Sequence, residues 1–515
     1  MTSSMQFPIN YHRRASRLIH VGTLTLGGTA PIRIQSMANT DTNDIEASVA
    51  QAKRIVNAGG EIVRFTTQGT IQVNNLKVIR QRLREDGVET PIVADVHFQA
   101  RVADLAAQCV DKVRINPGNY IDPARQFRSL QYTDEEYAAE LQRLEERFTA
   151  LLNICRQHHT ALRLGVNHGS LSDRIMSRYG DTPEGMVESV MEFLRICKAQ
   201  DFNDVVISVK ASNTAVMIRT MRLLASSMRD EDMDFPLHLG VTEAGDAEDG
   251  RIKSAVGIGA LLANGIGDTI RVSLSEAPEN EIPVAKELVS HIAAIASAPL
   301  MDEDVDTTPK PTGAKAIVIP DDFDEIPDNY ALLESVHQNP VGEIRRAVSI
   351  LRAQGDGRPV VVRRQYDTND ADTFRIHAAA DMGSLLIDGY IDGLQLVAPK
   401  LPPKVVSETA FSILQATRRR MTKTEYIACP GCGRTLFDLQ TTLKRIKDAT
   451  AHLTGLKIGV MGCIVNGPGE MADADYGYVG AARGCVSLYK GKQCIEKNIP
   501  EEQAVDRLLK LIENK

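Results

Sequence analysis

The chain has 515 residues and a mass of 56.4 kDa, which is too long for one ordinary hydrophobic core and predicts two or three domains. Its hydrophobic content of 43% and charged content of 24% are typical of a soluble globular protein. A net charge of −8 argues against a nucleic-acid-binding protein, which normally shows a basic patch or a high pI.

Neither a signal peptide nor a membrane span is expected. Residues 1–16 lack the apolar centre of a signal peptide, and no stretch is long and apolar enough to cross a bilayer. We therefore expect a cytoplasmic protein, in whose reducing surroundings the eight cysteines are thiols or metal ligands rather than disulfides.

Short β-rich runs, each followed by a segment of helical length, recur between residues 32 and 275. Eight strands that alternate with helices over this length predict a (β/α)8 barrel, or TIM barrel, within an α/β fold. A doubly wound open sheet fits the same alternation and stays open as the alternative. The predicted strands are 32–37, 61–67, 91–97, 112–118, 161–167, 204–210, 236–242 and 269–275.

Charged and polar residues interrupt these runs, although buried parallel strands are expected to be almost unbroken Val, Ile and Leu. In a barrel the C-terminal strand ends form the catalytic face, so these side chains are expected to meet at one mouth. Several cations there would repel one another unless an anion lay among them, and arginine's planar fork suits phosphate oxygens. The sequence thus predicts a small phosphorylated substrate, and the alternative is that each cation pairs with a neighbouring carboxylate. The cations are Arg64, Arg114, Arg163, Lys210 and Arg271, joined by Asp95, His97, Asn116, Asn167, Thr242, Glu243 and Ser273.

Two proline-rich joints, 297–313 and 398–404, divide the rest of the chain. Between them we expect a small α/β block with strands at 314–319, 359–366 and 385–396 and a helix at 342–355. It contains no group of residues that suggests catalysis or metal binding, so we interpret it as a spacer or packing domain. A further α/β unit follows, with strands at 425–429 and 457–463 and a closing amphipathic helix at 501–514. The expected domains are therefore 1–296, 297–416 and 417–515.

Three cysteines at strand ends are candidate metal ligands: Cys429 and Cys432 form a C-x-x-C motif, and Cys463 follows later with Glu470 nearby. A C-x-x-C motif alone fits zinc, an iron–sulfur cluster or a redox dithiol. Because Cys485 would complete an all-thiolate zinc site, spacing leaves zinc and iron–sulfur open. The remaining barrel cysteines, Cys109, Cys155 and Cys197, are expected to be inert core residues.

Five longer segments resemble the 4-hydroxy-3-methylbut-2-enyl diphosphate synthase family, the iron–sulfur enzymes of the methylerythritol phosphate route to isoprenoids. The resemblance implies a TIM barrel joined to a [4Fe–4S] α/β domain. It also implies a two-electron reductive ring opening of 2-C-methyl-D-erythritol 2,4-cyclodiphosphate, with loss of water. The segments are VADVH (93–97), VRINPG (113–118), GVNHGS (165–170), TEYIACPGCGR (424–434) and MGCIVNGPGE (461–470).

The same resemblance implies a role for each site residue. Glu470 becomes the unusual fourth cluster ligand in place of Cys485, and because carboxylate is a more exchangeable iron ligand than thiolate, it can open a site for substrate oxygen. Glu243 is the implied proton donor. The implied cluster ligands are Cys429, Cys432, Cys463 and Glu470; the implied substrate contacts are Arg64, His97, Arg114, Arg163, Asn167, Lys210, Arg271 and Ser273.

Compact bacterial members pass directly from barrel to cluster domain, whereas this chain inserts residues 302–416, as plant and chlamydial members do. In compact members the barrel of one subunit faces the cluster of its partner, so the insert leaves open which cluster domain covers which barrel. The resemblance implies a ferredoxin or flavodoxin as electron donor and a homodimer. A phosphate-binding barrel with a zinc-stabilised C-terminal module and no redox role is the alternative.

Overall fold

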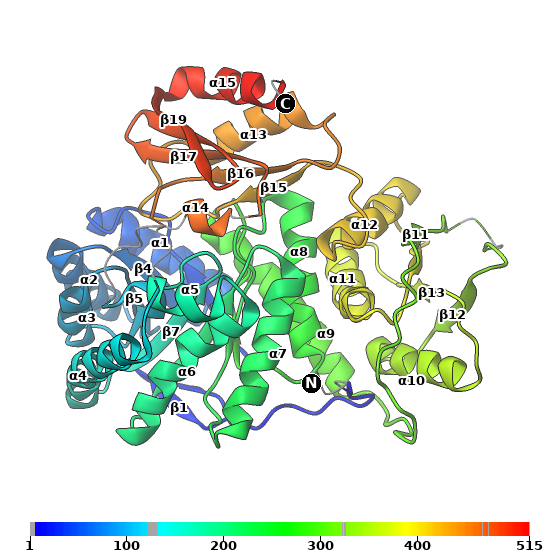
Figure 1. The fold of residues 1–515 in the computed structure, drawn as a ribbon, viewed down its shortest axis with the longest axis horizontal. Coiled ribbons are helices and arrows are strands. Elements are labelled where there is room, and N and C mark those ends of the chain that lie inside the picture. Colours follow the sequence, from blue (N-terminus) through cyan, green and yellow to red (C-terminus); the bar gives the residue numbers. More distant parts are fainter. Residues whose placement is uncertain are drawn as a thin grey trace.

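The computed structural model describes residues 6–121, 131–321, 323, 326–465, 467–471 and 473–513. Figure 1 shows three parts: a barrel drawn from blue to green, a yellow-green α/β unit beside it, and an orange to red unit above the barrel. Within the described residues, no helix combines the length and apolar composition that a membrane span needs.

The first part is a barrel of eight parallel strands in the order β8-β7-β6-β5-β4-β3-β10-β9. A parallel bridge between Ile207 and Leu237 joins the two outer strands. The predicted TIM barrel is confirmed, and the open-sheet alternative is wrong because an open sheet would leave those edges apart. The strands are β3 (Arg33–Met37), β4 (Ile62–Thr67), β5 (Ile92–Val96), β6 (Lys112–Ile115), β7 (Ala161–Asn167), β8 (Val205–Lys210), β9 (His238–Leu239) and β10 (Thr269–Ile270).

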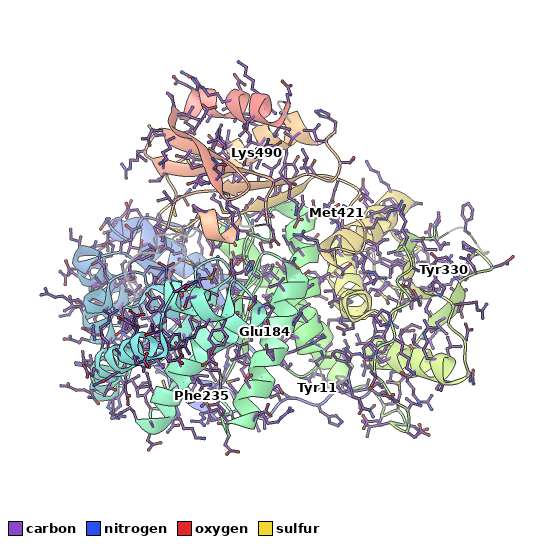
Figure 2. All side chains as sticks on the ribbon, viewed as in Figure 1. Tyr11, Glu184, Phe235, Tyr330, Met421 and Lys490 are labelled. Carbon is purple, nitrogen blue, oxygen red and sulfur yellow. The ribbon has the colours of Figure 1, made fainter. Side chains whose placement is uncertain are left out.

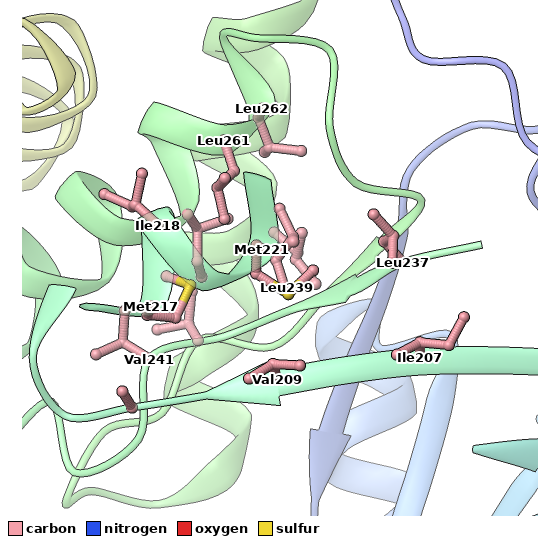
Figure 3. Close-up of a cluster of buried hydrophobic side chains, with 14 of the residues drawn as sticks. Ile207, Val209, Met217, Ile218, Met221, Leu237, Leu239, Val241, Leu261 and Leu262 are labelled. Atoms are coloured by element: carbon pink, nitrogen blue, oxygen red, sulfur yellow. The ribbon is translucent and has the colours of Figure 1, made fainter. Parts of the chain in front are cut away.

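Helices surround the barrel, and a hairpin closes its N-terminal end. The hairpin, β1 (Ile19–Val21) and β2 (Leu24–Leu26), packs its apolar side chains against the first inward-facing residues of four barrel strands. The helices are α1 (Ile45–Ala58), α2 (Thr70–Glu85), α3 (Ala100–Ala107), α4 (Asp134–His158), α5 (Asp173–Tyr179), α6 (Pro183–Ala199), α7 (Thr214–Asp230), α8 (Ala247–Leu262) and α9 (Glu281–Ala296). Figure 3 shows part of the core, where Met217 and Met221 of α7 lie near Val209 of β8 and Leu239 of β9.

The middle part is a four-stranded parallel sheet in the order β11-β14-β13-β12, covered by helices. The predicted strand 385–396 is partly wrong, because Leu385 and Leu386 lie in the last turn of α11, which ends at Gly389 in the left-handed conformation. Helix α11 is buried on most of its surface, so its apolar run has no visible helical period. The sequence also missed β12 and most of α11. The elements are β11 (Ile317–Val318), β12 (Ala331–Ser335), α10 (Pro340–Ala353), β13 (Val360–Gln365), α11 (Ala371–Asp388), β14 (Gly393–Val397) and α12 (Pro403–Ala416).

Close helix packing fixes this middle part to the barrel. A Cβ on Gly259 of α8 would lie 2.8 Å from the Cβ of Ala380 on α11, so the two helices approach almost backbone to backbone. Buried side chains of the two parts belong to one continuous hydrophobic core. The middle part therefore extends the barrel's packing instead of hanging from it by linkers.

The third part is a five-stranded sheet in the order β15-β16-β17-β18-β19, parallel at first and antiparallel from β17 onward. It has its own hydrophobic core. Met421 lies where the chain passes into it from the middle part (Figure 2). The predicted strands 425–429 and 457–463 are β15 and β16, but β17 to β19 were not predicted. The elements are β15 (Glu425–Ala428), α13 (Leu439–Thr450), β16 (Lys457–Met461), α14 (Gly467–Glu470), β17 (Tyr476–Ala482), β18 (Cys485–Lys490), β19 (Gln493–Pro500) and α15 (Glu501–Glu513).

Candidate active site

The C-terminal part covers the mouth of the barrel in the same chain, with α14 next to the barrel in Figure 1. Ser275 Oγ, just beyond β10, donates a hydrogen bond of 2.9 Å to the carbonyl of Cys429. Arg434 Nη2 forms an ion pair of 3.2 Å with Asp95 Oδ2 at the end of β5. These contacts assemble one enclosed site from residues far apart in sequence.

A cavity of about 100 Å³ lies between the barrel mouth and the C-terminal part. All thirteen site residues named from the sequence line it. They are Arg64, His97, Arg114, Arg163, Asn167, Lys210, Glu243, Arg271, Ser273, Cys429, Cys432, Cys463 and Glu470.

Strand geometry explains the barrel half of this set. Side chains alternate between the two faces of a strand, so Arg163 and Asn167, four residues apart on β7, both face the barrel interior. Arg114 on β6 is the in-register neighbour of both Asp95 and Arg163, so these three groups lie side by side.

Carboxylates neutralise only part of the cationic mouth. Arg114 Nη1 lies 3.0 Å from Asp95 Oδ1, and Arg271 Nη2 lies 3.0 Å from Glu281 Oε1. For these two cations the pairing alternative is correct. For the other three, Arg64, Arg163 and Lys210, no ion pair is found within the described residues, so there it is wrong.

Burial makes the uncompensated cations costly. Arg163 is 1% exposed, and among the described residues its Nη1 donates only to Ser208 Oγ, at 3.1 Å. Burial, followed by repulsion from neighbouring cations, lowers the pKa of Arg163 and of Lys210 well below their usual values. Burial likewise lowers the pKa of His97 to about 3, so this imidazole is neutral. A mouth with this excess of positive groups is built to receive an anion.

Thiols and a carboxylate line the opposite wall of the cavity. Cys429 follows β15, Cys463 follows β16, and both are held where adjacent parallel strands end. The amide of Gly462 donates to Cys429 Sγ at 3.2 Å, as backbone amides do to metal-bound thiolates. Burial raises the pKa of Cys463 to about 11 and raises that of Cys429 further, so these thiols ionise only beside a cation. Three cysteine side chains (Cys429, Cys432 and Cys463) and a carboxylate are a donor set that fits an iron–sulfur cluster.

The other cysteines lie outside this wall. Cys485 begins β18 and does not line the cavity. Cys155 and Cys197 are fully buried in the barrel's core, and Cys109 packs against it. All eight cysteines are free.

Two carboxyl groups meet across the cavity. Asn167 Nδ2 donates a hydrogen bond of 2.5 Å to Glu470 Oε1, linking β7 to α14. Glu243 is buried with φ of +48°, and burial together with the nearby Glu470 carboxylate raises its pKa well above the usual value. Glu243 Oε2 has no hydrogen-bond partner in the described part of the chain, so it is free to meet a bound group.

Sequence reasoning missed two charged residues of the site. Asp95 stood among the strand-end polar groups but was given no role, although it contacts both Arg114 and Arg434. Arg434 was not considered at all. Its position directly after the Cys429-Pro-Gly-Cys432-Gly run was the available signal, because a cation there stays close to the thiols.

The sequence matches two family descriptions. Residues 16–286 match the GcpE TIM-barrel domain, and residues 425–514 match the GcpE protein C-terminal domain. The segment between them, which holds the middle part, is covered by neither description.

Relatives match almost the whole chain. A protein of Bacteroides fragilis is 53% identical, over 98% of this chain and 96% of its own length. One of Phocaeicola vulgatus is 52% identical over 98% of both chains, and one of Protochlamydia amoebophila is 38% identical over 97% of this chain and 96% of its own. All three are named 4-hydroxy-3-methylbut-2-en-1-yl diphosphate synthase (flavodoxin).

These alignments span almost the whole chain, including the segment that the two family descriptions leave uncovered. The matches do not support the alternative of a zinc-stabilised module without a redox role. The two halves of the cavity correspond to the two matched domains. The chain therefore belongs to the 4-hydroxy-3-methylbut-2-en-1-yl diphosphate synthase family.

Proposed function

We propose that this chain opens the ring of 2-C-methyl-D-erythritol 2,4-cyclodiphosphate reductively and yields 4-hydroxy-3-methylbut-2-enyl diphosphate. Two electrons and two protons enter, one carbon–oxygen bond to the diphosphate and one to a hydroxyl break, and the hydroxyl oxygen leaves as water. The observation that carries this proposal is the single cavity joining an anion-binding barrel mouth to three thiols and a carboxylate.

In this proposal Cys429, Cys432, Cys463 and Glu470 hold a [4Fe–4S] cluster. Such a cluster would supply electrons one at a time, and Glu470, as a weaker ligand than a thiolate, would be the one to give way to a substrate oxygen. Asn167 orients Glu470 through its 2.5 Å hydrogen bond to Oε1. Ser275 Oγ and the close backbone approach of Gly169 and Gly469 hold the cluster wall against the barrel.

The barrel holds the diphosphate in this proposal. Arg64, Arg163 and Lys210 meet the phosphate oxygens, because they are the mouth cations without a carboxylate partner in the described residues. Arg114 and Arg271 are held in place by Asp95 and Glu281 and complete the anion site.

The remaining polar residues contact the substrate skeleton. Ser273 and neutral His97 line the cavity beside the cations and are assigned to its oxygens, as is Asn167. Glu243 faces Glu470 in the same cavity and is assigned as the proton donor to the departing hydroxyl group.

The electron donor in this proposal is a flavodoxin, because the relatives carry that donor in their names. The cytoplasm is the proposed location, consistent with eight free cysteines. We also propose the domain limits 1–296, 297–416 and 417–515, because each range contains one large sheet. All residues assigned to the site line a cavity within one chain, and the homodimer stays a prediction.

Anaerobic purification and turnover test the proposal together. We expect a brown protein with iron and sulfide near four of each per chain. It should reduce the cyclic diphosphate with dithionite or reduced flavodoxin as electron source. A colourless protein that holds one zinc ion and leaves the substrate unchanged would contradict the proposal.

A further inference from the structure

One buried cation in the barrel interior has no part in the proposed reaction. Lys112 begins β6 and is fully buried. Its in-register neighbours, Val93 and Ala161, belong to the apolar cluster that the β1–β2 hairpin closes. Because side chains alternate along a strand, Lys112 points into the barrel on the same face as Arg114. Lys112 therefore lies in the apolar layer of the barrel interior, on the N-terminal side of the cationic mouth.

No group around Lys112 neutralises it in the described part of the chain. Its Nζ lies 3.4 Å from Gln35 Oε1 on β3, which is a neutral acceptor. The charged groups that face it are Arg163 on β7 and Arg64 on β4, and the titratable His238 on β9 also lies within electrostatic reach. All of these are cations or can become cations.

The layer around Lys112 also leaves polar atoms unused. Gln35 Nε2, His238 Nε2 and Arg163 Nε are buried without hydrogen-bond partners in the described residues. His238 Nδ1 reaches only Thr269 Oγ1, at 3.4 Å. Burying a lysine among such groups costs stability, and hydrophobic residues of similar size would fill the space at less cost.

We propose that Lys112 is a positioning residue for the diphosphate and takes up a proton when the anion binds at the mouth. The inference rests on the proposed function, since it needs a diphosphate beside Arg163. Lys112 does not line the cavity, whereas Arg163 lines it and acts electrostatically on Lys112, so Lys112 acts through Arg163.

The driving force is electrostatic. Without an anion, burial and then the charges of Arg163 and Arg64 lower the pKa of Lys112 well below its usual value, which disfavours the protonated amine. A bound dianion offsets these positive charges and raises the pKa of the amine, and a proton then enters from solvent. Affinity for the anion should accordingly fall as pH rises over the range in which the free amine has lost the proton that the bound form still holds.

Calorimetric titration of the cluster-loaded full-length protein measures this proton directly. The cyclic diphosphate is titrated at pH 7.5 in buffers of different ionisation enthalpy, and the slope of the observed heat against that enthalpy gives the protons taken up. We expect net uptake by the unaltered protein. Zero uptake between pH 7 and pH 9 would overturn the inference without any variant.

Lys112→Met assigns the proton to its residue. The variant should take up fewer protons, by up to one per site, and bind the diphosphate on the order of tenfold more weakly. Its unfolding temperature should rise, because an unpaired buried amine is replaced by an apolar side chain. Lys53→Met is the matched control, since Lys53 is partly exposed and pairs with Asp86 on the surface. Equal uptake by Lys112→Met and the control would overturn the assignment.

Turnover separates this inference from the proposed function. If the anion binds with proton uptake but is not reduced, the proposed function is wrong and the role of Lys112 stands. If the substrate is reduced but no proton is taken up, the proposed function stands and the role of Lys112 is wrong. Inorganic pyrophosphate serves as a second titrant, and we expect uptake with it as well. If neither anion bound, both proposals would fall.

Discussion

Replacing Gly169 by alanine is expected to hold the C-terminal part away from the barrel mouth. Gly169 follows β7 with φ of +80°, and its backbone lies against that of Gly469 in α14. A Cβ at Gly169 would lie 2.3 Å from the carbonyl oxygen of Gly469, about 1 Å short of the 3.4 Å at which ordinary contact begins. The new Cβ would collide with backbone atoms of Gly469, which has no side chain, so no side-chain rotation can relieve the collision.

The structure gives the size of the effect. Alanine in the left-handed region costs roughly 1–2 kcal/mol of folding free energy, which this large core tolerates. To relieve the collision, Gly469 must move away from Gly169 by about 1 Å. Glu470 is the next residue, so it moves as well and its hydrogen bond to Asn167 is stretched or lost. A misplacement of that size near reacting groups lowers turnover by about 100-fold.

Gly455→Ala is the matched control. Gly455 has φ of +82°, and a Cβ there would meet nothing within 4 Å, so it carries the same backbone strain without the collision. Turnover with reduced flavodoxin, iron content and calorimetric affinity for the cyclic diphosphate are measured for both variants. We expect Gly169→Ala to lose turnover while it keeps its iron and its affinity. Equal turnover in the two variants would refute the reasoning.

Three further perturbations test the cluster wall, the anion site and the junction between barrel and middle part. Cys463→Ser should lose iron while Cys485→Ser keeps it, and loss of iron from both variants would move the fourth ligand from the carboxylate to Cys485. Arg163→Ala should weaken diphosphate binding by about 10- to 100-fold with iron content intact, and unchanged affinity in calorimetry would remove the anion-mouth argument. His377 of α11 stacks on His291 of α9 with ring centroids 4.0 Å apart, and burial followed by this neighbour lowers its pKa in the folded protein. The unfolded chain then binds more protons, so stability against urea should fall as pH drops below about 6.5, less steeply in His377→Gln; equal slopes would contradict this.

The local pattern of apolar and polar residues was enough to predict the barrel and most of its site. Each of the eight predicted runs contains an observed strand, and 161–167 matches β7 at both ends. Charged residues inside apolar runs are conspicuous, and the parallel arrangement sends their side chains to one end. Arg434 was not predicted as a site residue, because no periodic pattern of residues surrounds it.

Local pattern failed where burial hides periodicity. The run around Leu385 is apolar on all sides because α11 packs between the barrel and the middle sheet, so helix and strand look alike in sequence. Strand β19 was missed for the opposite reason, since it is mostly exposed and carries too few apolar residues to signal a strand.

The sequence by itself determined which side chains this protein can use: five cations on barrel strands, the thiols of Cys429, Cys432 and Cys463, and a carboxylate at Glu470. Only the tertiary structure decided that the C-terminal part covers the barrel of its own chain, and which cations keep a carboxylate partner. Asn167 and Glu470 are 303 positions apart, yet they share a hydrogen bond. Such a contact depends on how whole surfaces fit, as at Gly169 and Gly469, and no local pattern of residues encodes that fit.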